Sequence, residues 1–366
     1  MKIESFVLKV ASRCNLNCSY CYMYNKGDTS FKLQPKIMSV ETLECIATEI
    51  NLHVRKHNIG SIFIVFHGGE PMLAGIDFFI NAVKIFNEKI DVKINYAIQT
   101  NGTLLNKDWV VMFSDLSINV GISIDGPKKY HDEFRKFHNE KGSFETIMDN
   151  FNDKVKVENF GFLFVVNPLI PVGELYLFIK ESRIGTLNLL LPDHHYDDLP
   201  SFNDVKLADW LIDFYQLWRN DTNRPYIDFF ENIIKSFFNL SSGTQILGSC
   251  LNSVVCIETN GSIEVIDSLR TCESGITRNS LNVKNNRIDD IFTLPIYQKY
   301  YFSHKQVSDT CLKCELLETC GGGFLPHRYS KTNGFDNPSI YCNDLFTLIK
   351  FIELDVKTEI NRYATN

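Results

Sequence analysis

Short apolar runs rich in Val, Ile and Phe recur along the first half of the chain. Gly, Pro, Asn or Asp bounds each run, and this combination is typical of buried β-strands. The runs predict strands at residues 5–11, 62–66, 93–98, 118–124, 160–166 and 187–191.

Amphipathic segments with helical periodicity separate these strands. They predict helices at residues 39–57, 77–89, 106–115, 143–154 and 172–182, with another at 204–219. Ser39, Asn106 and Ser143 are suitable N-caps for three of them. The alternation predicts an α/β fold with parallel strands and right-handed crossovers, in a sheet that is open or partly rolled into a barrel. The repeats are fewer than the eight of a complete barrel.

Unusual polar motifs follow the predicted strands at the points where the strands end. In a parallel sheet the carboxyl ends of the strands meet at one edge, and functional sites form there. We therefore expect these motifs to converge. They are the cysteine stretch 14–21, "HGGEP" at 67–71, "QTNGTLL" at 99–105, "SIDGP" at 123–127 and "VNP" at 166–168.

Composition restricts the class of protein further. The 366 residues, 44% of them hydrophobic, suffice for one large domain or two smaller ones. A formal net charge of -7 without a basic stripe indicates that nucleic acid is not a partner. Neither a membrane-length apolar run nor a signal peptide is visible, so we expect no membrane association and a cytoplasmic location. In a reducing cytoplasm, eleven cysteines favour metal ligation or redox chemistry over disulfides.

The first cysteine motif has the spacing C-x3-C-x2-C and consists of Cys14, Cys18 and Cys21. Three thiolates on a short loop can hold three irons of a [4Fe-4S] cluster and leave the fourth iron open. A zinc site that takes a fourth ligand from elsewhere in the chain is the alternative.

The chain changes character from about residue 240 onward. Its periodicity breaks into short strands and turns, including an expected hairpin at 257–267. We predict one domain at 1–235 and a second at 236–366 that ends in a helix. Such a cysteine-dense, turn-rich segment is typical of a domain held together by metal clusters. Its cysteines are Cys250, Cys256, Cys272, Cys311, Cys314, Cys320 and Cys342.

The C-x3-C-x2-C motif, with Tyr20 before its last cysteine, and the loops listed above resemble the radical S-adenosylmethionine (SAM) superfamily. The resemblance implies a partial (β/α)6 barrel and a cluster whose open iron binds SAM. It also implies cofactor-binding roles for Gly68, Gly69, Glu70 and Pro71 at the SAM amino group, and for Ser123, Asp125 and Arg135 at its carboxylate and ribose. Gln99 and Asn101 would reach SAM or substrate. The alternatives without a functional role are a solvated helix face for Arg135 and an ordinary turn for Asn101.

The spacing C-x2-C-x5-C and the glycines that follow it resemble the SPASM extension of radical SAM enzymes that modify peptides. The resemblance implies a C-terminal iron-sulfur domain with one or two auxiliary [4Fe-4S] clusters. Cys311, Cys314, Cys320 and Cys342 would ligate one cluster completely. Cys250, Cys256 and Cys272 match three ligands of the other, but Phe324 stands where a fourth cysteine is frequent. We therefore expect the second cluster to lack one ligand, to take another ligand such as His327, or to be absent.

Residues 258–272 and 320–342 resemble SPASM enzymes that join an aromatic ring to an aliphatic β-carbon to form a three-residue cyclophane. The resemblance implies a ribosomal precursor peptide as substrate and a low-potential electron donor such as flavodoxin or ferredoxin. Asp267 and Glu273 are candidate catalytic bases. The alternatives are an anaerobic sulfatase-maturating enzyme that forms formylglycine, another SPASM chemistry such as thioether formation or epimerisation, and a noncatalytic iron-sulfur or zinc scaffold.

Overall fold

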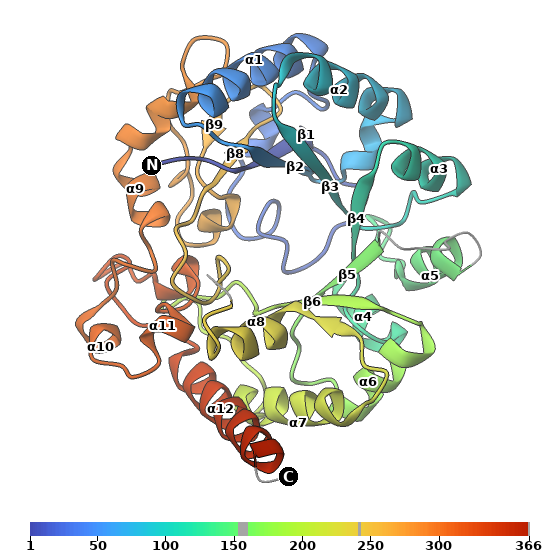
Figure 1. The fold of residues 1–366 in the computed structure, drawn as a ribbon. Helices are drawn as coiled ribbons and strands as arrows, with labels where there is room; N and C mark the ends of the chain where they lie inside the picture. Colours follow the sequence, from blue (N-terminus) through green and yellow to red (C-terminus); the bar gives the residue numbers. More distant parts are fainter. Residues whose placement is uncertain (153–159, 241–242, 365–366) are drawn as a thin grey trace. The chain divides into compact units, whose positions relative to one another are not determined.

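The computed structural model describes residues 1–152, 160–240 and 243–364, and its chain forms two compact units (Figure 1). The first comprises Met1–Ile124, Lys128–Phe162 and Ser253–Tyr301. The second comprises Asp125–Pro127, Leu163–Asn252 and Phe302–Asn366. The two units are defined by how compactly their residues pack, so they do not test the predicted domain boundary. That boundary, between residues 235 and 236, stays a prediction.

The first unit contains the first four predicted strands, which run parallel in the order β4-β3-β2-β1. Their bounds are Ser5–Ala11 (β1), Ser61–Gly68 (β2), Lys93–Thr100 (β3) and Ile118–Ser123 (β4). A late segment extends the sheet, because β8 (Val254–Ile257) pairs parallel with β1 and β9 (Ile263–Glu264) pairs antiparallel with β8. The loops after β1 to β4 therefore leave the sheet at the same edge.

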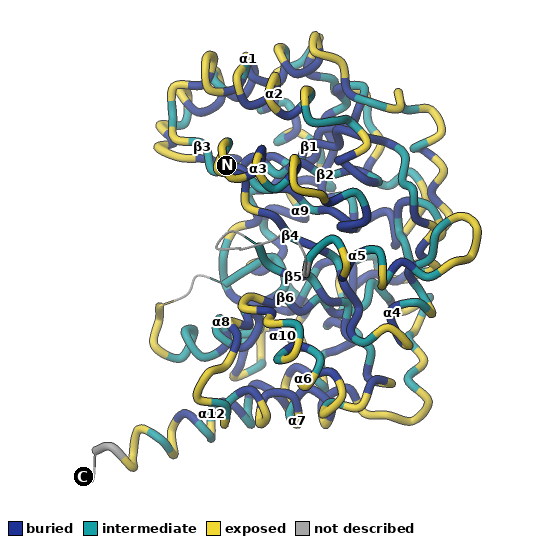
Figure 2. The backbone as a smooth tube through the Cα atoms, turned by 90° about the vertical axis from the view of Figure 1, so that its right-hand side faces the viewer, coloured by how far each residue is buried: buried dark blue, intermediate teal, exposed yellow. Residues whose placement is uncertain are grey.

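Helices α1 (Val40–Lys56), α2 (Ile76–Lys89) and α3 (Lys107–Asp115) cover these strands (Figure 1). Two predicted N-caps are confirmed: the Ser39 side chain accepts from the Thr42 amide, and the Asn106 side chain accepts from the amides of Asp108 and Trp109. Apolar side chains at helical spacing form the buried face of α1, while the outward turns of α1 and α2 are exposed (Figure 2).

The first unit also contains shorter elements. The predicted helix at 143–154 is present as α5 (Phe144–Asn152), and its last two predicted residues lie outside the described ranges. The Ser143 hydroxyl donates to the carbonyl of Arg135. The other short elements are η1 (Ser30–Leu33), η2 (Pro71–Ala74), α4 (Lys128–Phe134), η3 (Asp267–Thr271), η4 (Ile288–Thr293) and α9 (Pro295–Tyr301).

The second unit is mainly helical. Strand β5 (Phe160–Val165) begins in the first unit and ends in the second, where β6 (Thr186–Leu190) pairs parallel with β7 (Tyr226–Ile227). Closure of the whole sheet into a partial (β/α)6 barrel stays a prediction. The helices are α6 (Val172–Glu181), α7 (Leu207–Asn220), α8 (Asp228–Ser236), α10 (Asp309–Leu312), α11 (Leu317–Cys320), η5 (Leu325–Arg328) and α12 (Cys342–Ala364).

The predicted C-terminal helix corresponds to α12, which packs against α7 and α8. Hydrogen bonds support this packing, because Asp355 of α12 accepts from the Tyr215 hydroxyl at 2.8 Å and from Arg219 Nε at 3.1 Å. Across the three described ranges, no helix combines the length and the apolar character needed to cross a membrane.

A buried ion cluster stabilises Ser253–Tyr301, the late segment of the chain that belongs to the first unit. The Arg270 guanidinium donates through Nη2 to Glu258 at 2.6 Å and to Glu264 at 2.8 Å. Thr277 adds a hydrogen bond to Glu264 at 2.6 Å. Burial raises the pKa of Glu264, so its carboxylate depends on these donors to stay ionised.

Replacing Arg270 by Leu should destabilise the protein by about 3–5 kcal/mol, because it leaves two carboxylates buried without their cation. Anaerobic urea unfolding followed by circular dichroism measures the change. The matched control is Arg278→Leu, whose side chain is 46% exposed and pairs with Asp28 at 3.8 Å. We expect its effect to stay within about 0.5 kcal/mol. Equal effects of the two substitutions would show that the buried Arg270 cluster contributes no more to the free energy of unfolding than an exposed ion pair.

Candidate functional site

The cysteine loop follows β1 and contains three thiols that are close electrostatic neighbours. Burial raises the pKa of Cys14 to about 12, and the nearby Glu70 raises it further. Burial together with the Cys18 thiol raises the pKa of Cys21 to about 11. These thiols therefore stay protonated at neutral pH unless a bound cation compensates their charge, which is the usual situation of metal-ligating cysteines.

The loop after β2 pairs with the cysteine loop through its main chain. The Gly69 amide donates to the Ala11 carbonyl at 2.8 Å, and the Glu70 amide donates to the Arg13 carbonyl at 2.9 Å. A Cβ atom at Gly68 would clash with the Ala11 carbonyl oxygen, and one at Gly69 would clash with the Arg13 carbonyl oxygen. Gly68 also has φ +135, which side chains rarely adopt. Both glycines are therefore needed for this close approach.

Glu70 connects this loop to the one after β3. Its buried carboxylate accepts from the Met72 amide at 2.9 Å, the Thr100 hydroxyl at 2.8 Å and the Asn101 amide at 2.8 Å. Burial raises the pKa of Glu70 to about 6. The Asn101 side chain in turn donates to Asn15 Oδ1 at 2.9 Å and to Cys14 Sγ at 3.6 Å. Asn101 is thus more than a turn residue, because it contacts the cysteine loop directly.

Five other predicted site residues belong to the same group of loops. Gln99 at the end of β3 donates to the Ser123 hydroxyl at the end of β4, at 2.8 Å. Arg135 donates to the Tyr20 hydroxyl at 2.7 Å and is only 8% exposed, so it does not lie on a solvated helix face. Pro71 begins η2. Asp125 belongs to the second unit, where its side chain accepts from the Val165 amide at 3.4 Å, and its role at SAM stays a prediction.

The candidate base Asp267 is attached to the cysteine loop. It forms an ion pair with Lys9 of β1, and it accepts from the Tyr22 hydroxyl at 2.7 Å. Lys9 is fully buried and lies 3.3 Å from Nδ1 of His67. The other candidate base, Glu273, is exposed.

Sequence reasoning missed Lys9, Tyr22 and His67. The signal was present, because the strand "FVLKVA" carries a lysine between apolar residues, and a fully buried lysine is almost always paired. Burial lowers the pKa of Lys9. Its ion pair with Asp267 joins residues 258 positions apart in the sequence.

The second unit contains the four cysteines predicted to hold one auxiliary cluster. Burial raises the pKa of Cys320 to about 12, and the thiols of Cys342, Cys311 and Cys314 raise it further, so the four lie close together. The glycines that follow have positive φ, and a Cβ atom at Gly321 would clash with the Gly248 carbonyl oxygen. This donor set fits a four-thiolate cluster.

The three cysteines predicted to hold the other auxiliary cluster are distributed over both units. Cys250 belongs to the second unit, whereas Cys256 of β8 and Cys272 at the end of η3 belong to the first. Burial raises the pKa of Cys256 to about 12, while the nearby Lys9 lowers it. Their assignment to a second auxiliary cluster stays a prediction.

Comparison with known families agrees with this geometry. Residues 8–168 match the family model of the radical SAM superfamily, a range that includes the cysteine loop, the Gly68–Gly69 loop and the loops after β3 and β4. Residues 8–168 of the chain belong to the radical SAM superfamily. The cofactors of the protein are SAM and a [4Fe-4S] cluster, and the raised pKa values of Cys14 and Cys21 are typical of thiols whose charge a bound metal compensates.

Curated relatives of this radical SAM chain match it over most of its length. The cysteine-type anaerobic sulfatase-maturating enzyme of Clostridium novyi is 29% identical over 362 residues, which is 93% of each chain. The serine-type anaerobic sulfatase-maturating enzyme of Bacteroides thetaiotaomicron is 25% identical over 354 residues, 89% of this chain and 83% of the relative.

Among solved structures, native anSMEcpe with bound AdoMet (SAM) and Kp18Cys peptide matches with a TM-score of 0.81 and 25% identity. The match covers 98% of this chain and 99% of that one. The similarity therefore extends beyond the region of the family model and includes the cysteine-rich C-terminal part of the radical SAM chain.

The contact of the glycine loop with the cysteine loop can be tested by Gly69→Ala. The added methyl group would push the two loops apart, and a displacement of this size should reduce SAM cleavage by about 100-fold. Chromatographic quantification of 5'-deoxyadenosine measures the effect. Gly60→Ala is the matched control, because a Cβ atom there has no neighbour within 4 Å. Full SAM cleavage by the Gly69 variant would contradict this interpretation.

Proposed function

We propose that the chain is a radical SAM maturase that oxidises a residue of a peptide or protein substrate. The observation that carries the proposal is the connection of the cysteine loop to Glu70 and Asn101 on one side and, through Tyr22, to the candidate base Asp267 on the other. The relatives add support, because both are sulfatase-maturating enzymes and the solved structure of anSMEcpe contains a bound peptide.

Different residues of the chain serve the separate steps of a two-electron oxidation. When bound, SAM and its cluster supply a 5'-deoxyadenosyl radical, which takes a hydrogen atom from a substrate carbon. The substrate must then lose one proton and one more electron. We assign the removal of this proton to Asp267. Cys311, Cys314, Cys320 and Cys342 would hold a cluster suited to single-electron transfer, and a flavodoxin or ferredoxin is the proposed external donor.

Lys9 and Tyr22 prepare Asp267 for this role. The ammonium group of Lys9 favours the ionised carboxylate, which can accept a proton, and the Tyr22 hydroxyl fixes the direction of one carboxylate oxygen. Tyr22 is the neighbour of the predicted cluster ligand Cys21, so this oxygen lies next to the cysteine loop. A base in this position is within reach of a substrate held beside the cluster.

Formylglycine formation is the first candidate reaction, and the relatives favour it. The hydrogen atom would leave Cβ of a cysteine, the proton would leave Sγ, and the C=S bond formed would be hydrolysed by water to an aldehyde with release of hydrogen sulfide. A serine would give the aldehyde directly. The similarity over 93% of the cysteine-type relative supports this candidate.

Cyclophane formation in a precursor peptide is the second candidate reaction. Here the carbon left after hydrogen abstraction would bond to an aromatic ring, which then loses its proton and one electron. Residues 258–272 and 320–342 favour this candidate through their resemblance to cyclophane-forming enzymes. Arg328 of that segment has a structural role, because it is fully buried and donates to the carbonyls of Ser303 and Gln306.

Tandem mass spectrometry of two substrates distinguishes these reactions. The enzyme is incubated or co-expressed with a sulfatase-type peptide containing a central Cys and with the small peptide encoded beside its gene. Cys14→Ala is the inactive control. An aldehyde at the Cys position, detected by hydrazide labelling, indicates formylglycine. Loss of two hydrogens with blocked fragmentation across three residues indicates a cyclophane. SAM cleavage with both peptides unchanged would contradict the proposed function.

The role of Asp267 is tested by Asp267→Asn, which retains the size of the side chain and removes its basicity. Modified peptide should decrease by about 100-fold or more, as for loss of a general base, while 5'-deoxyadenosine is still formed. Comparing the yields of the two products in one reaction measures this uncoupling. Glu273→Gln serves as the control and should leave both yields unchanged. Normal peptide modification by the Asp267 variant would exclude it as the base.

A further inference from the structure

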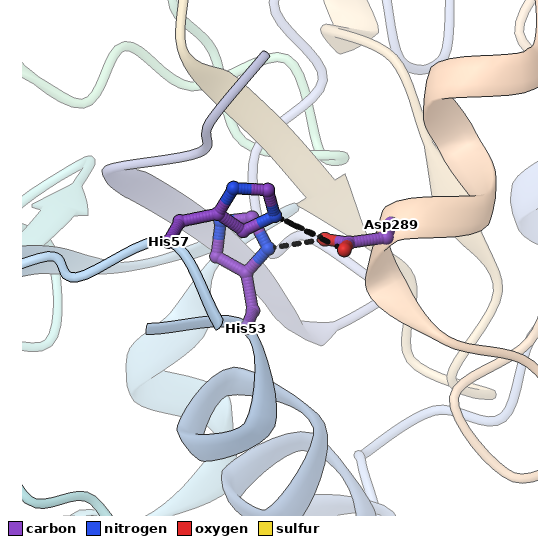
Figure 3. Close-up of side chains that lie close together, drawn as sticks. All are labelled: His53, His57 and Asp289. Carbon is purple, nitrogen blue, oxygen red and sulfur yellow. Dashed lines mark hydrogen bonds and ion pairs between the residues drawn. The ribbon is translucent and has the colours of Figure 1, made fainter. Parts of the chain in front are cut away.

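A cluster of two histidines and an aspartate lies in the first unit. Helix α1 places His53 one turn before His57, so that both rings are on one face, and η4 brings Asp289 opposite them (Figure 3). His53 Nδ1 lies 2.5 Å from Asp289 Oδ1, and His57 Nε2 lies 3.0 Å from Asp289 Oδ2. The three groups offer ligand atoms that all lie within 4.8 Å of one another.

We propose that His53, His57 and Asp289 form a binding site for a divalent transition metal ion, with zinc as the preferred ion. Two imidazole nitrogens and one carboxylate oxygen are typical zinc donors, and three protein ligands leave a fourth position for water. The donor atoms lie close enough to one another for a single ion. The site contains no sulfur, so it differs in chemistry from the iron-sulfur sites.

The main chain of Ile3 supports this assignment, because it can stabilise the His53 ring with or without a metal ion. The Ile3 amide lies 3.0 Å from His53 Nε2, and the Ile3 carbonyl lies 3.2 Å from the same atom. Without metal, Nε2 accepts from the amide while Nδ1–H donates to Asp289. With metal on Nδ1, the proton moves to Nε2 and is donated to the carbonyl. Metal-bound histidines typically make such a second hydrogen bond.

The surroundings also suit a metal ion. The ring of Phe292 lies 6.1 Å from the His53 ring and 6.0 Å from the His57 ring, so an apolar wall limits access of water. Lys56 contacts Asp289 Oδ2 at 2.6 Å, and its side chain is 67% exposed. The ion can therefore take Oδ1 while Lys56 keeps Oδ2 or moves into solvent. A bound ion would connect α1 to the segment Ser253–Tyr301, which carries Asp267.

Zinc content of the holoprotein tests the proposal. The protein is reconstituted anaerobically so that iron occupies the cysteine sites, equilibrated with zinc chloride, freed of excess metal and analysed by mass spectrometry of its metals. The wild type should bind one zinc ion per chain in addition to its iron. His57→Ala and Asp289→Asn should weaken this binding by more than about 100-fold, since loss of a direct ligand exceeds the effect of losing an outer partner.

Lys56→Ala is the control that separates a metal site from a network of ion pairs. It removes a cation that competes for the carboxylate and leaves the three ligands in place, so zinc should bind at least as tightly as in the wild type. Anomalous X-ray scattering at the zinc edge should locate the ion between His53 and His57. Equal zinc content in the wild type and the His57 variant, or no zinc above the iron sites, would overturn the proposal.

Discussion

The pairing of two loops through the main chain is the constraint on which the candidate site depends. The Gly69 and Glu70 amides donate to the carbonyls of Ala11 and Arg13, and this pairing holds the cysteine loop beside the end of β2. It requires glycine at 68 and 69, because any side chain would occupy the space of the facing carbonyls. Since Glu70 follows directly, the same pairing brings its carboxylate to the loop of β3.

Charges buried around this pairing are stable only in combination. Lys9 of β1 is buried away from water, and Asp267 compensates its charge. The charge of Arg270 is compensated by Glu258 and Glu264. Burial of an unpaired charge costs several kcal/mol. Because Asp267 and Arg270 both belong to η3, the two ion clusters together keep this helix attached to the sheet. The position of the candidate base depends on the same interactions that stabilise the unit.

Much of the fold could be predicted from the sequence, because strands and helices depend on local periodicity. The bounds of β1 to β6 and of α1 to α3 agree with the expected ranges within a few residues. The convergence of the cysteine, glycine and Asn101 loops also followed from the rule for parallel strands. Helix α4 was missed, because it has only seven residues and mixed charges give it no clear period.

Contacts between distant parts of the sequence could not be predicted. The pairing of β8 with β1 depends on tertiary packing, and so does the return of Ser253–Tyr301 to the first unit. Asp267 was proposed only for its closeness to Cys272 in the sequence, whereas its partner Lys9 lies far away in the chain. His53 and His57 have the spacing of neighbours on a helix, but nothing in the sequence indicates that Asp289 lies opposite them.

The environment of Asp267 constrains the order of steps in either candidate reaction. Lys9 and Tyr22 both stabilise its ionised form. A carboxylate is a weak base, which removes a proton readily only from a group that has become acidic. Loss of a hydrogen atom from the substrate carbon makes the adjacent thiol, or the ring carbon to which the new bond has formed, far more acidic than before. We infer that proton transfer to Asp267 follows hydrogen abstraction, so the carboxylate need not deprotonate the intact substrate.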